Sequence, residues 1–257
     1  MAYWVLKIVL TPVIRLLFHV RSEGTQNVPR KGPVILASNH QSFIDSVFLP
    51  LVVRRRVTFV AKAEYFESWK TAWFFRAVGM IPLKRGGGPA SARALAAAKE
   101  VLDSGGVLGI YPEGTRSLDG RLYKGHTGVA RLSMQCNAPV VPVAQFGTAE
   151  VQPIGATRLK LFCRVKVKMG KPLRWESADE RDSGALRKFT DEIMAAIASL
   201  SGQEVVPNYA KRDKGRLSAP GSEADPLPPE GPDGTRGSDG RDPGMRRTRP
   251  SGRRRVP

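Results

Sequence analysis

A histidine and a carboxylate five residues apart follow an apolar run that is long enough to form a buried strand. They are His40 and Asp45, within Asn39-His40-Gln41-Ser42-Phe43-Ile44-Asp45. Five residues turn a side chain by roughly 140° around an α-helix, so one helix face cannot carry both groups. A chain turn can bring the two groups together if Ser42 is the N-cap of a helix over residues 43–49, with Asp45 in the first turn of that helix. A carboxylate on one imidazole nitrogen leaves the other free to take a proton from an alcohol.

These seven residues also have a structural explanation. Ser42-x-x-Asp45 matches a capping box, in which case His40 is an ordinary turn residue. Three further blocks favour the chemical interpretation, and they follow in order along the chain: Gly79-Met80-Ile81-Pro82-Leu83-Lys84-Arg85, Tyr111-Pro112-Glu113-Gly114-Thr115-Arg116-Ser117 and Val140-Val141-Pro142-Val143.

In order and spacing the four blocks resemble those of the glycerolipid acyltransferases, whose commonest member is 1-acylglycerol-3-phosphate acyltransferase (lysophosphatidic acid acyltransferase). The resemblance covers residues from about 28 to 173. It implies transfer of a fatty acyl group from acyl-CoA or acyl carrier protein to the free hydroxyl of 1-acylglycerol 3-phosphate, giving phosphatidic acid. His40 is then the base and Asp45 its support. The acceptor hydroxyl itself attacks, so neither an acyl-enzyme nor a metal or cofactor is expected.

The third block is expected to bind the acceptor phosphate. It follows a strand, and in a parallel sheet its loop comes close to the first block. Arg116 offers a planar fork for a phosphate, and Gly114 allows the backbone to approach closely; Thr115 lies between them. Glu113 is expected to shape the loop and to hold Arg116. The alternative is a structural turn with an internal Glu-Arg ion pair.

Further cations extend this expected site. Arg85 closes the second block, beside Lys84, where the family more often has an acidic or amide residue. Lys124 is a phosphate ligand by resemblance. His126 is the competing base, but no acidic residue stands near it in the sequence, so it ranks second.

Composition limits the partners. The 257 residues carry a formal net charge of +18, which indicates an anionic lipid surface, a phosphorylated substrate or nucleic acid. No nucleic-acid-binding motif is recognisable, so that rival class is not favoured. Glycerol 3-phosphate, another lysolipid or a glycolipid remains possible as the acceptor. The two cysteines, Cys136 and Cys163, lack metal-ligand spacing and are typical of a reducing compartment.

Apolar strands alternate with helical segments between residues 23 and 205, which predicts a single α/β domain with a mixed, mostly parallel sheet flanked by helices. Strands are expected at 33–37, 58–62, 80–83, 107–111, 140–145 and 163–169, and helices at 64–78, 91–103, 126–135 and 183–200. The 64–78 helix carries Trp69, Trp73 and neighbouring aromatic residues, which either pack on the core or lie at the headgroup level of a membrane.

Both ends of the chain carry membrane predictions. Residues 1–22 are mostly apolar, with Lys7, Thr11, Arg15 and His19 in one polar stripe. They predict a membrane-associated amphipathic helix, with the protein peripheral or monotopic on the cytoplasmic face of the cell membrane; the alternative is a helix that covers the protein's own core. Residues 206–257 are rich in Pro, Gly and Arg and predict a disordered basic tail, either on anionic lipid or free in solvent.

Overall fold

The computed structural model describes residues 2–62, 72–73, 75, 79–83, 90–176 and 183–210, all within the first of the chain's two units, Met1–Asp225. The strands are β1 (Arg21–Glu23), β2 (Val34–Ser38), β3 (Val57–Lys62), β4 (Met80–Leu83), β5 (Val107–Ile110), β6 (Leu122–Tyr123), β7 (Val140–Phe146), β8 (Lys166–Met169) and β9 (Val205–Val206). The helices are α1 (Ala2–Phe18), α2 (Asp45–Val52), α4 (Ala90–Asp103), α5 (Gly128–Cys136), α6 (Thr148–Val151) and α7 (Ser183–Ser201), with a 3₁₀ turn at Thr25–Asn27.

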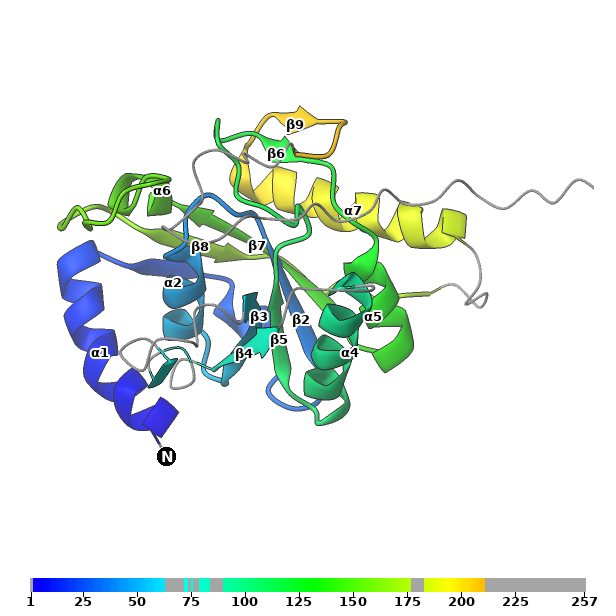
Figure 1. The fold of residues 1–257 in the computed structure, drawn as a ribbon, viewed down its shortest axis with the longest axis horizontal. Helices are drawn as coiled ribbons and strands as arrows, with labels where there is room; N and C mark the ends of the chain where they lie inside the picture. Colours follow the sequence, from blue (N-terminus) through cyan, green and yellow to red (C-terminus); the bar gives the residue numbers. More distant parts are fainter. Residues whose placement is uncertain are drawn as a thin grey trace, which may run out of the picture. The chain divides into compact units, whose positions relative to one another are not determined.

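Seven strands form one sheet in the order β1-β8-β7-β2-β5-β3-β4. All neighbouring pairs are parallel except β7 and β8, so the predicted mixed, mostly parallel sheet is confirmed. At its centre, β2 pairs with β5 on one side and β7 on the other, placing Ile35 beside both Leu108 and Val140. The carboxyl ends of β2, β5 and β7 therefore meet at one edge of the sheet (Figure 1).

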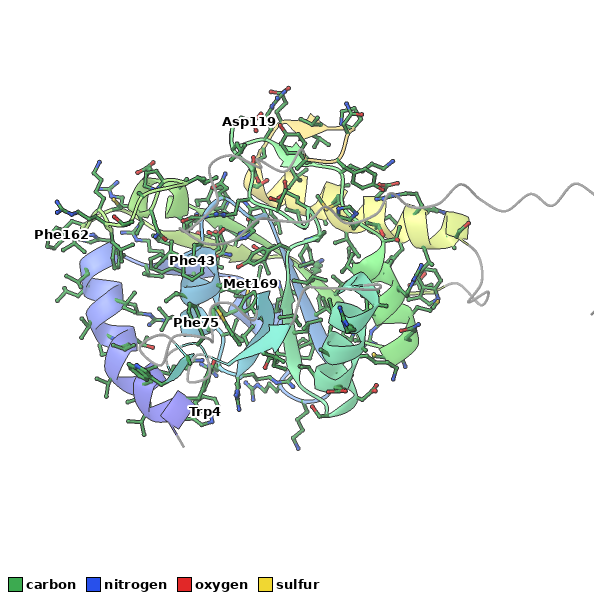
Figure 2. The ribbon with its side chains drawn as sticks, in the orientation of Figure 1. Trp4, Phe43, Phe75, Asp119, Phe162 and Met169 are labelled. Atoms are coloured by element: carbon green, nitrogen blue, oxygen red, sulfur yellow. The ribbon has the colours of Figure 1, made fainter. Side chains whose placement is uncertain are left out.

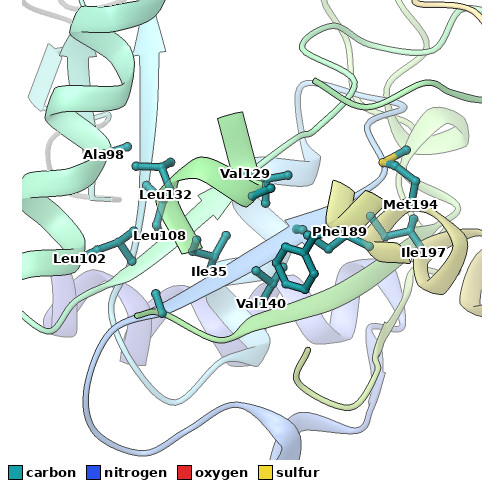
Figure 3. Close-up of a cluster of buried hydrophobic side chains, with 14 of the residues drawn as sticks. Ile35, Ala98, Leu102, Leu108, Val129, Leu132, Val140, Phe189, Met194 and Ile197 are labelled. Carbon is teal, nitrogen blue, oxygen red and sulfur yellow. The ribbon is translucent and has the colours of Figure 1, made fainter. Parts of the chain in front are cut away.

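Helices cover both faces of the sheet, which explains why every residue of β2 is buried. On one face, Ile35 packs with residues of α4, α5 and α7, including Leu102, Leu132 and Ile197 (Figure 3). On the other, Val34 and Leu36 pack with Leu49 of α2 and with residues of β7. The continuous apolar run of β2 is the sequence signature of this two-sided burial.

The predicted strands are found with ends that agree within one residue, except for the start of the last strand. The alternation from Cys163 to Met169 does bury its apolar members, but β8 begins only at Lys166. The Val165 N–H donates instead to the Phe18 carbonyl oxygen at the end of α1 (3.2 Å). Strands β1, β6 and β9 and helix α6 were not predicted, because two to four residues carry no readable period. The helix expected at 64–78 lies mostly outside the described residues.

Helix α1 packs in an unexpected orientation. Lys7 Nζ donates to the carbonyl oxygens of Val53 and Arg55. The ammonium group is partly buried there, and the burial lowers the pKa of Lys7 to about 8. The Thr11 hydroxyl donates to the carbonyl oxygen of Lys7. The beginning of the polar stripe therefore faces the domain, while an apolar stripe is exposed, formed by Trp4, Val5, Ile8, Val9, Val13 and Leu16. Within the described residues, no helix is both long enough and apolar enough to cross a membrane.

The predicted start of the tail is wrong by at least five residues. Val205 and Val206 form β9, which pairs in parallel with β6, and the Lys124 N–H donates to the Asn208 carbonyl oxygen (3.1 Å). The tail boundary was predicted from composition alone. These backbone hydrogen bonds depend instead on the fold, which brings residues 205–208 beside residues 122–124.

Substituting Gly109 by Ala should destabilise the domain. A Cβ at this position of β5 would lie 2.3 Å from the Phe59 ring, which is itself buried. Overpacking of this kind costs about 1–3 kcal/mol. Urea unfolding measures it, with Gly128→Ala as the control because a Cβ there meets only Leu95 Cδ2 at 3.3 Å. Equal midpoints for the two variants would contradict the tight packing between Phe59 and β5.

Candidate active site

The residue before His40 fixes the end of β2. The Asn39 side chain pairs with the backbone of Gln145 in β7, accepting its N–H at Oδ1 (2.8 Å) and donating from Nδ2 to its carbonyl oxygen (3.1 Å). Asn39 is 1% exposed. The side-chain amide continues the pairing of β2 with β7, so the chain leaves the sheet at a fixed position and His40 begins the turn.

His40 and Asp45 are in direct contact. His40 Nδ1 lies 2.9 Å from Asp45 Oδ2, and the same oxygen accepts the N–H groups of Gln41 and Ser42 at 2.8 Å each. Asp45 is fully buried, while the His40 side chain is 16% exposed. With the carboxylate on Nδ1, the proton-accepting position of the neutral imidazole is Nε2, which has no hydrogen-bond partner among the described residues.

The predicted N-cap is wrong. Helix α2 begins at Asp45 after Ile44, without a side-chain cap. The Ser42 hydroxyl donates to the Gln152 carbonyl oxygen (2.7 Å), and the Asp45 carboxylate takes the N–H groups of the turn. Ser42 is thus committed to a tertiary contact at the base of the loop that follows α6.

A second carboxylate joins the His40 turn to the loop of the third block. Glu113 accepts the His40 N–H at Oε1 (3.2 Å) and the Tyr123 N–H at Oε2 (3.0 Å), and the Ser117 N–H donates to the His40 carbonyl oxygen (2.7 Å). Burial raises the pKa of Glu113 to about 7, although both N–H donors act in the opposite direction. The loop therefore lies beside the first block, as the parallel sheet predicted.

Aromatic rings support the imidazole. His40 stacks on Tyr111 with ring centroids 3.7 Å apart and planes inclined by 9°, and Tyr111 stacks in turn on Phe59 at 5.6 Å. The Tyr111 hydroxyl lies 2.9 Å from Ser46 Oγ. Burial raises the pKa of Tyr111 well above its ordinary value, and the nearby Asp45 adds to this, so the ring stays neutral. The stack holds the plane of the imidazole that Asp45 orients.

Arg116 does not pair with Glu113, so that expectation is wrong. Among the described residues the Arg116 guanidinium forms no ion pair or hydrogen bond, since Glu113 is engaged by His40 and Tyr123. Gly114 has the left-handed φ of +71° that its turn requires, and Thr115 stands between it and the partly exposed Arg116. The guanidinium is therefore available to an anion, and its loop is hydrogen-bonded to the His40 turn.

The other predicted binding residues are placed as follows. Lys124 Nζ lies over the Tyr209 ring, 5.3 Å from its centroid. The His126 ring stacks on Tyr209 at 4.7 Å, and a Cβ at Gly114 would lie 3.0 Å from it. His126 is thus an exposed residue that lies between the loop at Gly114 and the Tyr209 ring. Lys84 and Arg85 lie outside the described residues.

Sequence reasoning missed four residues of this region. Asn39 and Tyr111 stand inside or at the edge of the blocks already identified, so their position was a usable signal. Gln203 and Tyr209 follow α7 and had none. Gln203 accepts from Asn39 Nδ2 (2.9 Å) and donates to the Gly120 carbonyl oxygen (2.6 Å), linking the end of α7 to both loops.

Known proteins are similar to the part of the chain that contains this site. A family model described as Acyltransferase matches residues 19–145, which include His40, Asp45 and the Glu113–Arg116 loop. A solved structure, the 1-acyl-sn-glycerophosphate (LPA) acyltransferase PlsC from Thermotoga maritima, superposes with a TM-score of 0.55 at 27% identity, covering 68% of this chain and 69% of that one. Residues 19–145 thus belong to the acyltransferase family.

The curated relatives of this chain carry one activity in their names. The chloroplastic 1-acyl-sn-glycerol-3-phosphate acyltransferase of Arabidopsis thaliana is 29% identical over 68% of this chain and 49% of its own length. The Bacillus subtilis protein of the same activity name is 27% identical over 64% of this chain and 78% of its own. The chain thus matches about half the length of the plant relative.

The pKa of Glu113 predicts a stability change with pH. The ordinary pKa is 4.5 and the folded value about 7, so the folded protein binds the proton more tightly than the unfolded chain. The resulting stabilisation is complete below pH 4.5 and is lost as the pH rises through 7. Relative to Glu113→Gln, the free energy of unfolding should fall by about 3 kcal/mol across this range in urea titrations. A difference that does not change with pH would mean that Glu113 is ionised throughout.

Proposed function

We propose that the protein transfers a fatty acyl group from a thioester to the free hydroxyl of 1-acylglycerol 3-phosphate, giving phosphatidic acid. The observation that carries the proposal is the His40–Asp45 pair with Arg116 in the adjoining loop, where neither His40 Nε2 nor the Arg116 guanidinium has a partner among the described residues. This combination supplies a base for an alcohol and a cation for a phosphate. The activity names of the relatives point to the same substrate class.

The reaction needs one proton carrier. His40 Nε2 takes the proton of the acceptor hydroxyl as its oxygen attacks the thioester carbonyl carbon. Asp45 holds Nδ1–H and stabilises the imidazolium that forms. As the tetrahedral intermediate collapses, the carbon–sulfur bond breaks, and the imidazolium returns the proton to the departing thiolate. The ester forms and His40 is again neutral, without a protein nucleophile.

Arg116 binds the acceptor phosphate in this proposal, with Lys124 and Arg85 as further cations. The loop that carries Arg116 is bonded to the His40 backbone through Glu113 and Ser117. Phosphate binding therefore fixes the acceptor relative to the base. Placement of this kind converts binding energy into a favourable attack geometry.

Membrane association is the third part of the proposal. The exposed apolar stripe of α1 fits a helix lying in the acyl boundary of the cytoplasmic leaflet of the cell membrane. Both lipids of the reaction reside there. The protein is then peripheral or monotopic, and its excess of cations favours an anionic surface.

A thiol-release assay over a matrix of substrates tests the activity. The donors are acyl-CoA and acyl carrier protein thioesters, and the acceptors are 1-acylglycerol 3-phosphate, glycerol 3-phosphate and an unphosphorylated lysolipid. We expect release to depend on 1-acylglycerol 3-phosphate with at least one donor. Release only with glycerol 3-phosphate would assign the other acceptor class.

In that assay His40→Ala should abolish turnover while leaving the fold intact, because the base is partly exposed at a turn. Asp45→Asn should lower kcat on the order of 10²–10⁴-fold, since an amide no longer supports the imidazolium. Circular dichroism and thermal unfolding check the fold. Near wild-type turnover by His40→Ala would assign the base elsewhere, with His126 the next residue to substitute.

Arg116→Ala should raise the KM for the phosphorylated acceptor far more than the KM for the donor. A lost charge-assisted hydrogen bond costs about 1.5–3 kcal/mol, which corresponds to roughly a 10- to 150-fold change. Arg116→Lys should restore the binding only in part, because it keeps the charge and loses the fork. Arg131→Ala, on the exposed side of α5, is the matched control for net charge. An unchanged acceptor KM would place the phosphate at other cations.

A further inference from the structure

The loop between α6 and β8 exposes three large apolar side chains within four residues. Leu159 is 42% exposed, Leu161 47% and Phe162 66%. Single exposed apolar residues are common on soluble proteins, but a group of this kind marks a contact surface. Figure 2 shows Phe162 beside the C-terminal end of α1, whereas Trp4 lies at the other end of that helix.

Hydrogen bonds fix this loop in its outward position. The Phe162 N–H donates to the Leu17 carbonyl oxygen (2.8 Å), and the Lys160 N–H donates to that of Val151 (2.8 Å). Phe162 itself has a φ of +62°, which an aromatic residue rarely adopts. The next residue, Cys163, is buried. The fold thus holds the Phe162 ring outward and joins the loop to the end of α1.

The charged residues of the segment that contains the loop are all cations, although one of them, Lys166, pairs with Glu23 (2.7 Å). Residues 151–175 contain seven Lys and Arg residues and no Asp or Glu. Three of these cations, Arg158, Lys160 and Arg164, are exposed in the loop itself. Exposed apolar side chains with cations beside them fit the interface of an anionic bilayer. The apolar side chains enter the acyl boundary, and the cations bind lipid phosphates.

We propose that residues 158–164 form a second membrane-contact element, beside α1, that inserts Leu161 and Phe162 into an anionic bilayer. The inference rests on the proposed function for the lipid nature of the substrates. It adds a geometric consequence, since the Ser42 hydroxyl donates to the carbonyl oxygen of Gln152, at the start of the same loop (2.7 Å). Insertion of the loop therefore sets the position of the His40 turn relative to the headgroups.

Vesicle sedimentation of the full-length protein tests the proposal, using phosphatidylcholine vesicles with and without phosphatidylglycerol. The Leu161→Asp/Phe162→Asp variant should bind the anionic vesicles about tenfold more weakly than the wild type. Ala96→Asp adds a carboxylate to the exposed side of α4, across the domain from α1 (Figure 1), and should not change binding. Wild-type binding by the double variant would overturn the proposal, as would an equal loss in Ala96→Asp.

Two further measurements separate the causes. Arg158→Gln/Lys160→Gln should weaken binding only to the anionic vesicles, and an equal loss on both compositions would contradict the role of charge.

If the aspartate variant does not fold, Phe162→Trp replaces it. Lipids with brominated acyl chains should then quench more of the tryptophan fluorescence of this variant than of the wild type. Unchanged quenching overturns insertion, as does a fall in molar mass of the aspartate variant, which would indicate a contact between copies. The vesicles contain neither donor nor acceptor, so normal binding by a protein that fails the acyltransferase assay leaves this proposal standing.

Discussion

The buried carboxylate of Glu113 joins the two loops on which the proposed chemistry depends. One oxygen holds the backbone of His40, at the end of β2, and the other holds the backbone of Tyr123, which lies beyond the Arg116 loop. The contact is possible only because β2 and β5 are parallel neighbours, so that the residues after both strands emerge at the same edge. A side chain that the sequence suggested for the phosphate loop therefore also fixes the backbone that carries the base.

The two buried carboxylates around His40 differ in their surroundings. One oxygen of Asp45 receives three hydrogen bonds, from the imidazole and from two backbone N–H groups. Glu113 receives one N–H on each oxygen, and its burial outweighs them, which raises its pKa to about 7. Asp45 is consequently suited to support an imidazolium. Glu113 can lose its charge without breaking the backbone contacts outright, because a protonated carboxyl group still has acceptor capacity.

The architecture and the blocks were readable from the sequence because each has a local signature. The apolar run of β2 indicates burial on both faces, and the spacing of His40 and Asp45 requires a turn. What failed was the assignment of partners. The Ser42 side chain is suited to the expected cap, yet its partner is the backbone of Gln152, which is distant in sequence. The Glu113 side chain is suited to the expected ion pair, yet it binds the backbone of His40 instead. Gln203 and Tyr209 follow α7, and only the fold brings them to the loops.

The orientation of α1 shows the same limit and bears on function. The periodicity separated Lys7 and Thr11 from the apolar residues, but it did not indicate which side meets the domain. Two backbone carbonyl groups near the end of α2 accept from the Lys7 ammonium, so the polar stripe begins against the protein and leaves Ile8 and Leu16, 71% and 75% exposed, to the outside. Burying a cation against carbonyl dipoles is tolerable because the hydrogen bonds replace those to water. In the proposed membrane association, the helix offers apolar side chains to lipid without losing its attachment to the domain, which fits the proposed reaction of lipid substrates.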